Sequence, residues 1–421
     1  MKVRTSRHAG VRKELLRWRM DEKDIPFPRR EFRERLARLK SAMGSWGLDM
    51  VFLSSPESMY YFSGYKNEWY QAQSCAEWPP ASGIAVHRDR SGFILFDTEE
   101  EYLLARHTSV ADDIRVFPAD ERPDGEMPGW IVEELKGENW LPARVGLEMR
   151  SYRPNRIVSE LFQKELQREG CQVADCTSLV RGLRRIKSSL ELRCVERAAE
   201  IAIIGMRACQ ESIRPGATEL EVWGNVMRAM AHAGGENQAI TMPVSSGPRA
   251  PLIHALATRR KIEKGDLVVT DVCGVYNRYH VNCVRTFSVG KPRPAIERGV
   301  RLAGKAFDIL ERLIEPNLPV ERLLSAMKDY YSRAGIEKRK WWWGGYELGI
   351  AFPPDWVGEF VYDPTIDPAG ARFEPGMVVN YESNFYLPEN AGLAALVDTL
   401  VFRRSSARIM CKEIPFELIT V

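Results

Sequence analysis

The sequence predicts two domains of mixed helices and strands, an α/β domain followed by a larger α+β domain. The length of 421 residues is enough for two or three domains with a sizeable core. Residues 25–175 alternate short apolar runs with helical patterns, which is typical of an α/β domain. Residues 180–421 begin with two long helical patterns and continue with groups of strands, which indicates an α+β domain. Residues 1–24 form a separate basic arm.

Composition and charge exclude several classes of protein. The chain is 44% hydrophobic and 28% charged, as in ordinary soluble proteins, and its net charge of +3 is too small to indicate nucleic acid as a partner. The arm contains Glu14 and is followed by "MDEKD", so we expect a solvated amphipathic segment. No apolar run approaches the ~20 residues of a membrane span, and no signal peptide is visible. Eight cysteines without paired short spacings predict reduced thiols in a cytoplasmic protein.

In the first domain, helical and strand patterns follow one another closely. Residues 28–44 carry apolar side chains at helical spacing, namely Phe32, Leu36, Leu39 and Met43. Further helices are predicted at "EEEYLLARH" and "RIVSELFQKELQREG". The predicted strands are the apolar runs "LDMVFLSS", "SGIAVHRD", "SGFILFDT" and "ARVGLEM".

In the second domain, two capping boxes mark the starts of long helices. Ser188 and Glu191 open the helix "SLELRCVERAAEIAIIGMRACQES", and Thr218 and Glu221 open the helix that ends at a Gly pair, "ELEVWGNVMRAMAHAGG". A third helix, "ERGVRLAGKAFDILERLI", separates two groups of strands. These strands are "DLVVTDVCGVYNRYHVNCVRTFSVG" before it and "MVVNYESNFYL" and "LVDTLVF" after it.

Asp271 begins the group of residues that could carry chemistry. It ends the strand-like run "GDLVVTD", and Asn282 follows eleven residues later, where a second carboxylate would suit a metal held across a hairpin. His254 and His280 flank this stretch. A single histidine is more often structural, but imidazole beside a carboxylate is the usual arrangement for general-base chemistry. Glu382 interrupts an apolar strand, so it is paired or functional if it is buried, and it could equally face solvent.

Residues 338–360 contain four of the eleven tryptophans. The segment reads either as an aromatic plug under a glycine turn or as the wall of a pocket for a small organic molecule. Trp356 and Glu359 lie on a proline-stiffened loop, where an aromatic face beside an acid suits a cationic ligand.

Several motifs in order resemble the creatinase/prolidase ("pita-bread", peptidase M24-like) superfamily, which includes the methionine aminopeptidases. They are "RLARLKSAMGSWGLDMVFLSSPESMYYFSGY", "LRRIKSSLELRCVERAAEIA", "GDLVVTDVCGVYNRYHVNCVRTFSVG" and "EPGMVVNYESNFY". The resemblance implies a creatinase-like N-terminal domain followed by a pita-bread catalytic domain. It also implies a homodimer, in which Tyr65, Trp69 and Tyr70 would reach the partner's active site.

The metallopeptidases of that superfamily hold two metal ions with two Asp, one His and two Glu. The corresponding positions here are Asp271, Asn282, Tyr346, Glu382 and Val397, so three of the five ligands are missing. Two carboxylates are too few for a stable dinuclear site. We therefore expect neither a metal nor another cofactor.

The metal-independent branch of the superfamily offers a closer likeness. His254 falls on the creatinase histidine that activates water, and Glu382 falls on one creatinase glutamate, whereas the other falls on Val284. "RYH" and "GYELGIAFPPDWVGE" resemble ectoine hydrolase. The chain departs from that pattern at Asp271, at Glu347 and at Glu382.

Together, the residues and the resemblance predict a metal-independent hydrolase that cleaves a non-peptide C–N bond of a small cationic or amidine-like compound. His254 would be the general base, Asp271 and Glu382 would stabilise the substrate or orient water, and His280 would protonate the leaving nitrogen. The remaining expected substrate contacts are Tyr346, Glu347, Trp356 and Glu359. Three alternatives stay open: a lyase acting on a small zwitterion, a non-catalytic binding protein, and an Xaa-Pro dipeptidase-like metallopeptidase.

Overall fold

The computed structural model describes residues 11–18, 22–71, 81–119 and 122–421. The chain divides into two compact units, Met1–Leu183 and Arg184–Val421. Among the described residues, none of the helices combines the length and the apolarity that crossing a membrane requires.

The first unit is built on a six-stranded mixed sheet with the strand order β4-β3-β2-β1-β5-β6. Strands β1 and β2, and β2 and β3, pair antiparallel, whereas the pairs β3/β4, β1/β5 and β5/β6 are parallel. The strands are β1 Met50–Leu53, β2 Gly83–His87, β3 Ile94–Thr98, β4 Asp113–Phe117, β5 Arg144–Leu147 and β6 Gln172–Asp175.

The helices of the first unit agree in part with the sequence patterns. All four apolar residues predicted to face the core from α2 are buried. The structure adds helices α1, α3, α5 and α7 and strands β4 and β6, which the sequence patterns did not predict. The helices are α1 Lys13–Leu16, α2 Arg29–Ser45, α3 Pro56–Ser63, α4 Tyr102–Thr108, α5 Met127–Gly137, α6 Arg156–Arg168 and α7 Thr177–Arg185, with 3-10 turns η1 Trp69–Gln71 and η2 Asp124–Glu126.

The second unit is built on a nine-stranded sheet whose main path is β12-β11-β14-β15-β9-β8-β7, with β16 on β15 and β17 on β9. Its strands are β7 Val244–Ser246, β8 Leu267–Tyr276, β9 Tyr279–Ser288, β11 Lys340–Tyr346, β12 Val361–Tyr362, β14 Val378–Tyr386, β15 Leu393–Phe402, β16 Ala407–Ile409 and β17 Ile419–Thr420. A separate pair consists of β10 Leu318–Pro319 and β13 Arg372–Phe373.

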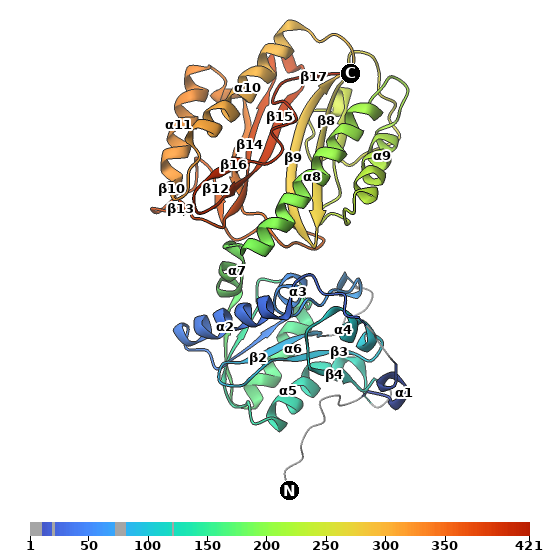
Figure 1. The fold of residues 1–421 in the computed structure, drawn as a ribbon, viewed down its shortest axis with the longest axis vertical. Coiled ribbons are helices and arrows are strands. Elements are labelled where there is room, and N and C mark those ends of the chain that lie inside the picture. Colours follow the sequence, from blue (N-terminus) through green and yellow to red (C-terminus); the bar gives the residue numbers. More distant parts are fainter. Residues whose placement is uncertain (1–10, 19–21, 72–80, 120–121) are drawn as a thin grey trace. The chain divides into compact units, whose positions relative to one another are not determined.

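Four long helices pack on this sheet in two pairs (Figure 1). Helix α8 Ser189–Ser212 packs on β8 and β9, helix α9 Glu219–His232 packs on α8 and β7, and both carry the predicted capping boxes. Helices α10 Pro294–Leu313 and α11 Val320–Arg333 form the other pair, in which α10 contacts β14 and β15. Short 3-10 turns complete the unit: η3 Gly247–Arg249, η4 Glu337–Arg339 and η5 Pro388–Asn390.

The predicted hairpin of β8 and β9 closes with a two-residue turn. Asn277 and Arg278 both have positive φ, 49° and 62°, between the paired residues Tyr276 and Tyr279. Positive φ at both central residues is characteristic of a type I′ turn, whose twist suits a hairpin. The turn sets the register in which Asp271 pairs with Val284.

Candidate active site

Two carboxylates lie on one face of the central sheet of the second unit. Asp271 on β8 pairs with Val284 on β9, and Val284 pairs with Val397 on β15. Val397 in turn pairs with Glu382 on β14. Residues directly opposite each other in antiparallel strands project to the same face, so two valines lie between the two acids. The site therefore has an acid at each side and an apolar floor.

Three buried asparagines connect the acids, and we call Asn282, Asn380 and Asn384 the amide network. Asn282 Nδ2 donates to Asp271 Oδ1. Asn380 Nδ2 donates to Asn282 Oδ1 at 3.2 Å and to Glu382 Oε1 at 3.0 Å. Asn384 Nδ2 donates to the other Glu382 oxygen at 2.8 Å. The two carboxylates are thus positioned by a continuous chain of amide groups.

Burial favours the protonated form of both acids. Burial raises the pKa of Asp271 to about 8, with a further rise from the Glu382 charge and an opposing effect of the Asn282 hydrogen bond. Burial also raises the pKa of Glu382 to about 7, against hydrogen bonds from Asn380, Tyr346 and Asn384. Near neutral pH Asp271 is therefore mostly protonated, whereas Glu382 is partly ionised.

Tyr346 and Trp356 close one side of this site. Burial, followed by the charges of Glu382 and Asp271, raises the pKa of Tyr346 well above its ordinary value, so the phenol stays neutral. It forms hydrogen bonds with Trp356, Asn380 and Glu382, and its backbone N–H donates to Asn380 Oδ1 at 2.8 Å. The structure thus brings together Asp271, Glu382, Tyr346 and Trp356, all of which were expected from the sequence.

His280 does not have the geometry of the predicted proton donor. It is fully buried, its Nε2 accepts from the Ala239 N–H at 3.1 Å, and its Nδ1 lies 2.8 Å from the Arg278 carbonyl oxygen. Burial, then the Arg278 charge, lowers the pKa of His280 to about 3, so the ring is neutral. Since both nitrogens bond to backbone groups, we correct the role of His280 to support of the site.

His254 lies in the exposed segment that follows β7. Its ring contacts Trp341 edge-on, with centroids 5.4 Å apart. Among the described residues, the structure shows no hydrogen bond from His254 to Asp271 or Glu382. The predicted general base is therefore not assembled with the acids, whereas the acids are assembled with each other.

Glu347 and Glu359 lie apart from the carboxylate pair. Glu347 is 4% exposed and accepts from Lys187 Nζ at 2.7 Å, so it joins the end of β11 to the segment before α8. The ion pair uses Oε1, whereas Oε2 is buried without a hydrogen-bond partner among the described residues, so the role of Glu347 as a substrate contact stays a prediction. Glu359 lines a different cavity, together with Arg185 and Phe360.

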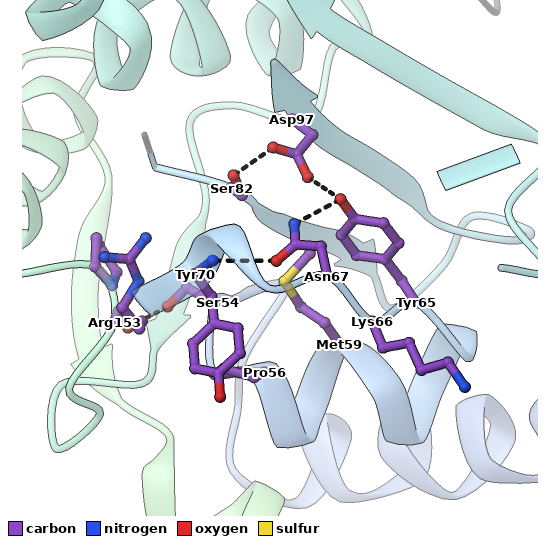
Figure 2. Close-up of a pocket in the computed structure, with 11 residues that line it drawn as sticks. Ser54, Pro56, Met59, Tyr65, Lys66, Asn67, Tyr70, Ser82, Asp97 and Arg153 are labelled. Atoms are coloured by element: carbon purple, nitrogen blue, oxygen red, sulfur yellow. Dashed lines mark hydrogen bonds between the residues drawn. The ribbon is translucent and has the colours of Figure 1, made fainter. Parts of the chain in front are cut away.

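The residues expected to reach a partner subunit lie in the first unit. Tyr65 is 2% exposed, and its phenol donates to Asp97 at 2.5 Å and accepts from Asn67 at 2.7 Å (Figure 2). It is therefore enclosed by its own domain, which corrects the expectation. Tyr70 is half-buried and lines the same pocket. The side chain of Trp69 lies outside the described residues.

The amide network is the part of the site that the sequence analysis missed. Asn380 and Asn384 lie two residues before and after Glu382 on β14, so strand alternation places all three side chains on one face. The pattern "NYESN" could have indicated this arrangement.

Comparison with known proteins identifies the family of each of the two domains. Residues 35–186 match the creatinase/prolidase N-terminal domain, and residues 193–404 match metallopeptidase family M24. The chain belongs to metallopeptidase family M24. The predicted fold class, a creatinase-like domain followed by a pita-bread domain, is confirmed.

Members of the family that resemble this chain include dipeptidases. An Xaa-Pro dipeptidase of Pyrococcus furiosus is 27% identical over 381 residues, covering 90% of this chain and 98% of the relative. An ectoine hydrolase of Halomonas elongata is 26% identical, covering 91% and 96%. The crystal structure of a prolidase from Pyrococcus horikoshii superposes with a TM-score of 0.72 at 22% identity, covering 90% and 98%.

These relatives correct the predicted reaction. The main prediction, hydrolysis of a non-peptide C–N bond, is wrong. The likeness to Xaa-Pro dipeptidases extends over nearly the whole chain. The family supports a hydrolase, and it favours the dipeptidase alternative over the lyase and the binding protein.

The donor set does not fit the pair of metal ions that the family name implies. A divalent ion binds oxygen lone pairs, but the groups facing the two acids are the N–H groups of Asn282, Asn380 and Asn384. Tyr346 presents a neutral phenol, and Val397 has no ligand atom. The positions around the two acids are therefore already filled by hydrogen-bond donors rather than by further metal ligands.

A second cluster of ligand-type residues, Cys283, Asp398 and Cys411, is also unsuited to a cation. Arg285 Nη2 lies 2.7 Å from Asp398 Oδ2. Asp398 Oδ1 accepts from two backbone N–H groups. The guanidinium therefore already occupies the position of a positive charge.

Proposed function

We propose that the chain hydrolyses the peptide bond of small, dipeptide-sized substrates, with Asp271 and Glu382 as a proton-sharing pair. The observation that carries this proposal is the linkage of the two acids by the amide network above an apolar floor. The Xaa-Pro dipeptidase relatives support the choice of a dipeptide as substrate.

The pair supplies both an acid and a base at the same time. The ionised carboxylate takes a proton from water as the water oxygen attacks the carbonyl carbon, and the protonated carboxyl gives its proton to the carbonyl oxygen. When the tetrahedral intermediate collapses, the C–N bond breaks and the proton taken from water passes to the leaving nitrogen, while one hydroxyl group of the intermediate returns its proton to the other carboxylate and becomes the carbonyl of the product acid. Tyr346, held by Trp356, would donate its O–H to the carbonyl oxygen in place of Glu382.

His254 has a separate part in this proposal. Because the ring is exposed beside Trp341, we place it at the rim, where it contacts substrate. His254→Ala is then expected to raise KM more than it lowers kcat. A complete loss of kcat with an unchanged fold would restore the histidine as the base.

The test is a panel of Xaa-Pro and other dipeptides incubated with the purified chain, with free amino acids measured by mass spectrometry. Asp271→Asn and Glu382→Gln should each lower kcat by about 10²–10⁴-fold, the usual range for acid–base groups. Glu417→Gln changes an exposed glutamate and serves as the matched control. Lack of cleavage of every dipeptide would reject the substrate class.

Chelation tests the chemistry separately from the substrate. The proposal expects the same turnover with and without a strong chelator, because no step uses a metal. Activity that appears only with added Mn²⁺ or Co²⁺ would reject the proton-sharing pair while retaining the dipeptide.

The proposed state of the enzyme is a cytoplasmic homodimer, as the family resemblance implies. Sedimentation of the purified chain at micromolar concentration measures this directly. A monomer with full activity would remove the dimer from the proposal.

A further inference from the structure

The first unit contains a groove between helix α2 and the amino ends of strands β3 and β4. These two strands are parallel, so their amino ends lie at the same edge of the sheet. The groove measures about 690 Å³, within the range of sites that bind small molecules. It belongs to the other unit from the carboxylate pair and has room for an organic ligand.

Helix α2 presents a basic stripe to this groove. Arg29, Arg33 and Lys40 recur at helical spacing, and all three line the groove. The acidic residues of the helix, Glu31 and Glu34, do not line it and are paired with other arginines of α2. The helix therefore directs positive charge, without its own acids, toward the groove.

Two cations of this stripe are available to a ligand. The exposed Arg33 guanidinium has no acidic or hydrogen-bond partner among the described residues. Lys40 Nζ donates to the Arg90 carbonyl oxygen, which leaves further N–H groups of the ammonium for a ligand. Burial lowers the pKa of Lys40 against the raising effect of Asp89, whose carboxylate is itself paired with Arg88. An anion beside Lys40 would compensate for this burial.

Arg90 adds a cation from the turn between β2 and β3. Its exposed side chain lines the groove and has no acidic partner in the described part of the chain. Because Lys40 bonds to its carbonyl oxygen, these two cations lie at the same end of the groove. Arg33 precedes Lys40 by two turns of α2, about 10 Å along the helix axis. The unpaired positive charge therefore has two centres.

Three acids limit the groove at its other end, and each is paired with an arginine. Asp112 lies 3.6 Å from Arg29, and Asp113 and Glu138 lie 2.9 Å and 2.6 Å from Arg115. Their charges repel any further anionic group at this end. The groove is therefore suited to two anionic groups and unsuited to a long polyanion.

The floor of the groove is apolar. Leu36 lies between Arg33 and Lys40 on α2, and Phe93 and Trp140 line the groove from other elements. Each of the three apolar side chains is less than a tenth exposed. An apolar chain laid across this floor would remove its remaining surface from water, which favours binding.

We propose that this groove binds a small dianion whose two anionic groups are about 10 Å apart and joined by an apolar chain. One anionic group lies on Arg33, and the other lies on Lys40 and Arg90. This site is separate from the proposed peptidase site and stands whether or not that function holds.

The experiment is calorimetric titration of the full-length protein with azelate, in which a straight chain of methylene groups separates two carboxylates. Azelate should bind saturably. Succinate, with both charges on a short chain, and nonanoate, with one charge on a chain of the same length, should each bind at least tenfold more weakly. Equal affinity for azelate and either of them, or no binding of azelate, would overturn the proposal. Tighter binding of tetraglutamate would overturn the assignment to a dianion with an apolar chain.

Variants locate the site. Arg33→Gln and Arg90→Gln each remove an exposed guanidinium, so they should fold normally and weaken azelate about tenfold. Arg33→Gln should bring the affinity for azelate down to that for nonanoate. Arg30→Gln removes an 82% exposed arginine of the same helix that does not line the groove, and it should leave binding unchanged. Wild-type affinity for azelate in either Arg33→Gln or Arg90→Gln would overturn the site.

Discussion

Asn380 contacts both sides of the candidate site through one side chain. Its Nδ2 donates to Asn282 and to Glu382, and its Oδ1 accepts from the Tyr346 N–H. A donor to a carboxylate stabilises the ionised form, so Asn380 holds the pKa of Glu382 below the value that burial alone would produce.

Replacing this amide should affect turnover and its pH dependence together. Asn380→Ala is expected to lower kcat by about 10–100-fold, as is typical for groups that orient catalytic ligands. The loss of the donor should raise the pKa of Glu382. The acidic limb of the pH–rate profile should therefore shift to higher pH. Gln210→Ala on the exposed face of α8 is the control. An unmoved acidic limb would show that Asn380 only supports the fold.

His280 makes a prediction about stability in acid. Its pKa is lowered to about 3 in the folded protein, against about 6.5 in the unfolded chain. Between these values only the unfolded chain takes up the proton, so the stability present above pH 6.5 is lost as the pH falls. The urea midpoint should decrease from pH 7 to pH 4, and His280→Gln should flatten this decrease. The exposed His232→Gln should keep the wild-type slope.

At the scale of elements, helix α8 and strand β8 approach each other closely at Gly274. A Cβ added to Gly274 on β8 would lie 1.9 Å from the Ala198 carbonyl oxygen of α8 and 2.7 Å from the Ala202 nitrogen. The glycine therefore allows the longest helix of the second unit to pack directly on the strand that carries Asp271.

Two alanine substitutions in the same unit should therefore have opposite effects. Gly274→Ala should lower the free energy of unfolding by about 1–3 kcal/mol or more, because the backbones must separate. Gly224 lies in helix α9 with nothing within 4 Å of an added Cβ, so Gly224→Ala should raise it by about 0.5–1 kcal/mol. Denaturant titration of both variants measures the difference. An unchanged free energy of unfolding in Gly274→Ala would mean that α8 and β8 can move apart without cost.

Across the whole molecule, the sequence predicts where helices, strands and turns form better than it predicts which side chains are buried. The caps at Ser188 and Thr218 and the turn between β8 and β9 follow from local chemistry, and the structure has them. The burial of His280 could not be predicted in this way. It shares a face of β9 with Asn282, but Ala239 and Trp356, distant in sequence, contact it there. Tyr65 was misjudged for the same reason, since its partner Asp97 lies on another strand.

At the scale of the whole second unit, the missing metal ligands can be restored and metal binding measured. Replacing Asn282 by Asp, Tyr346 by His and Val397 by Glu together would supply lone pairs at the three positions that lack them. The triple variant should bind Mn²⁺ measurably by calorimetry, whereas the wild-type chain should not. Stoichiometric binding of Mn²⁺ by the wild-type chain would contradict the proton-sharing pair.

The amide network also determines how the site ages. Asparagine is among the thermolabile side chains, and its hydrolysis leaves an aspartate in the same place. At Asn282 this change would replace the donor to Asp271 by a third carboxyl group beside the pair. Burial within paired strands protects all three amides. Deamidation, a mass increase of one dalton, should therefore reach these amides only after the strands have opened.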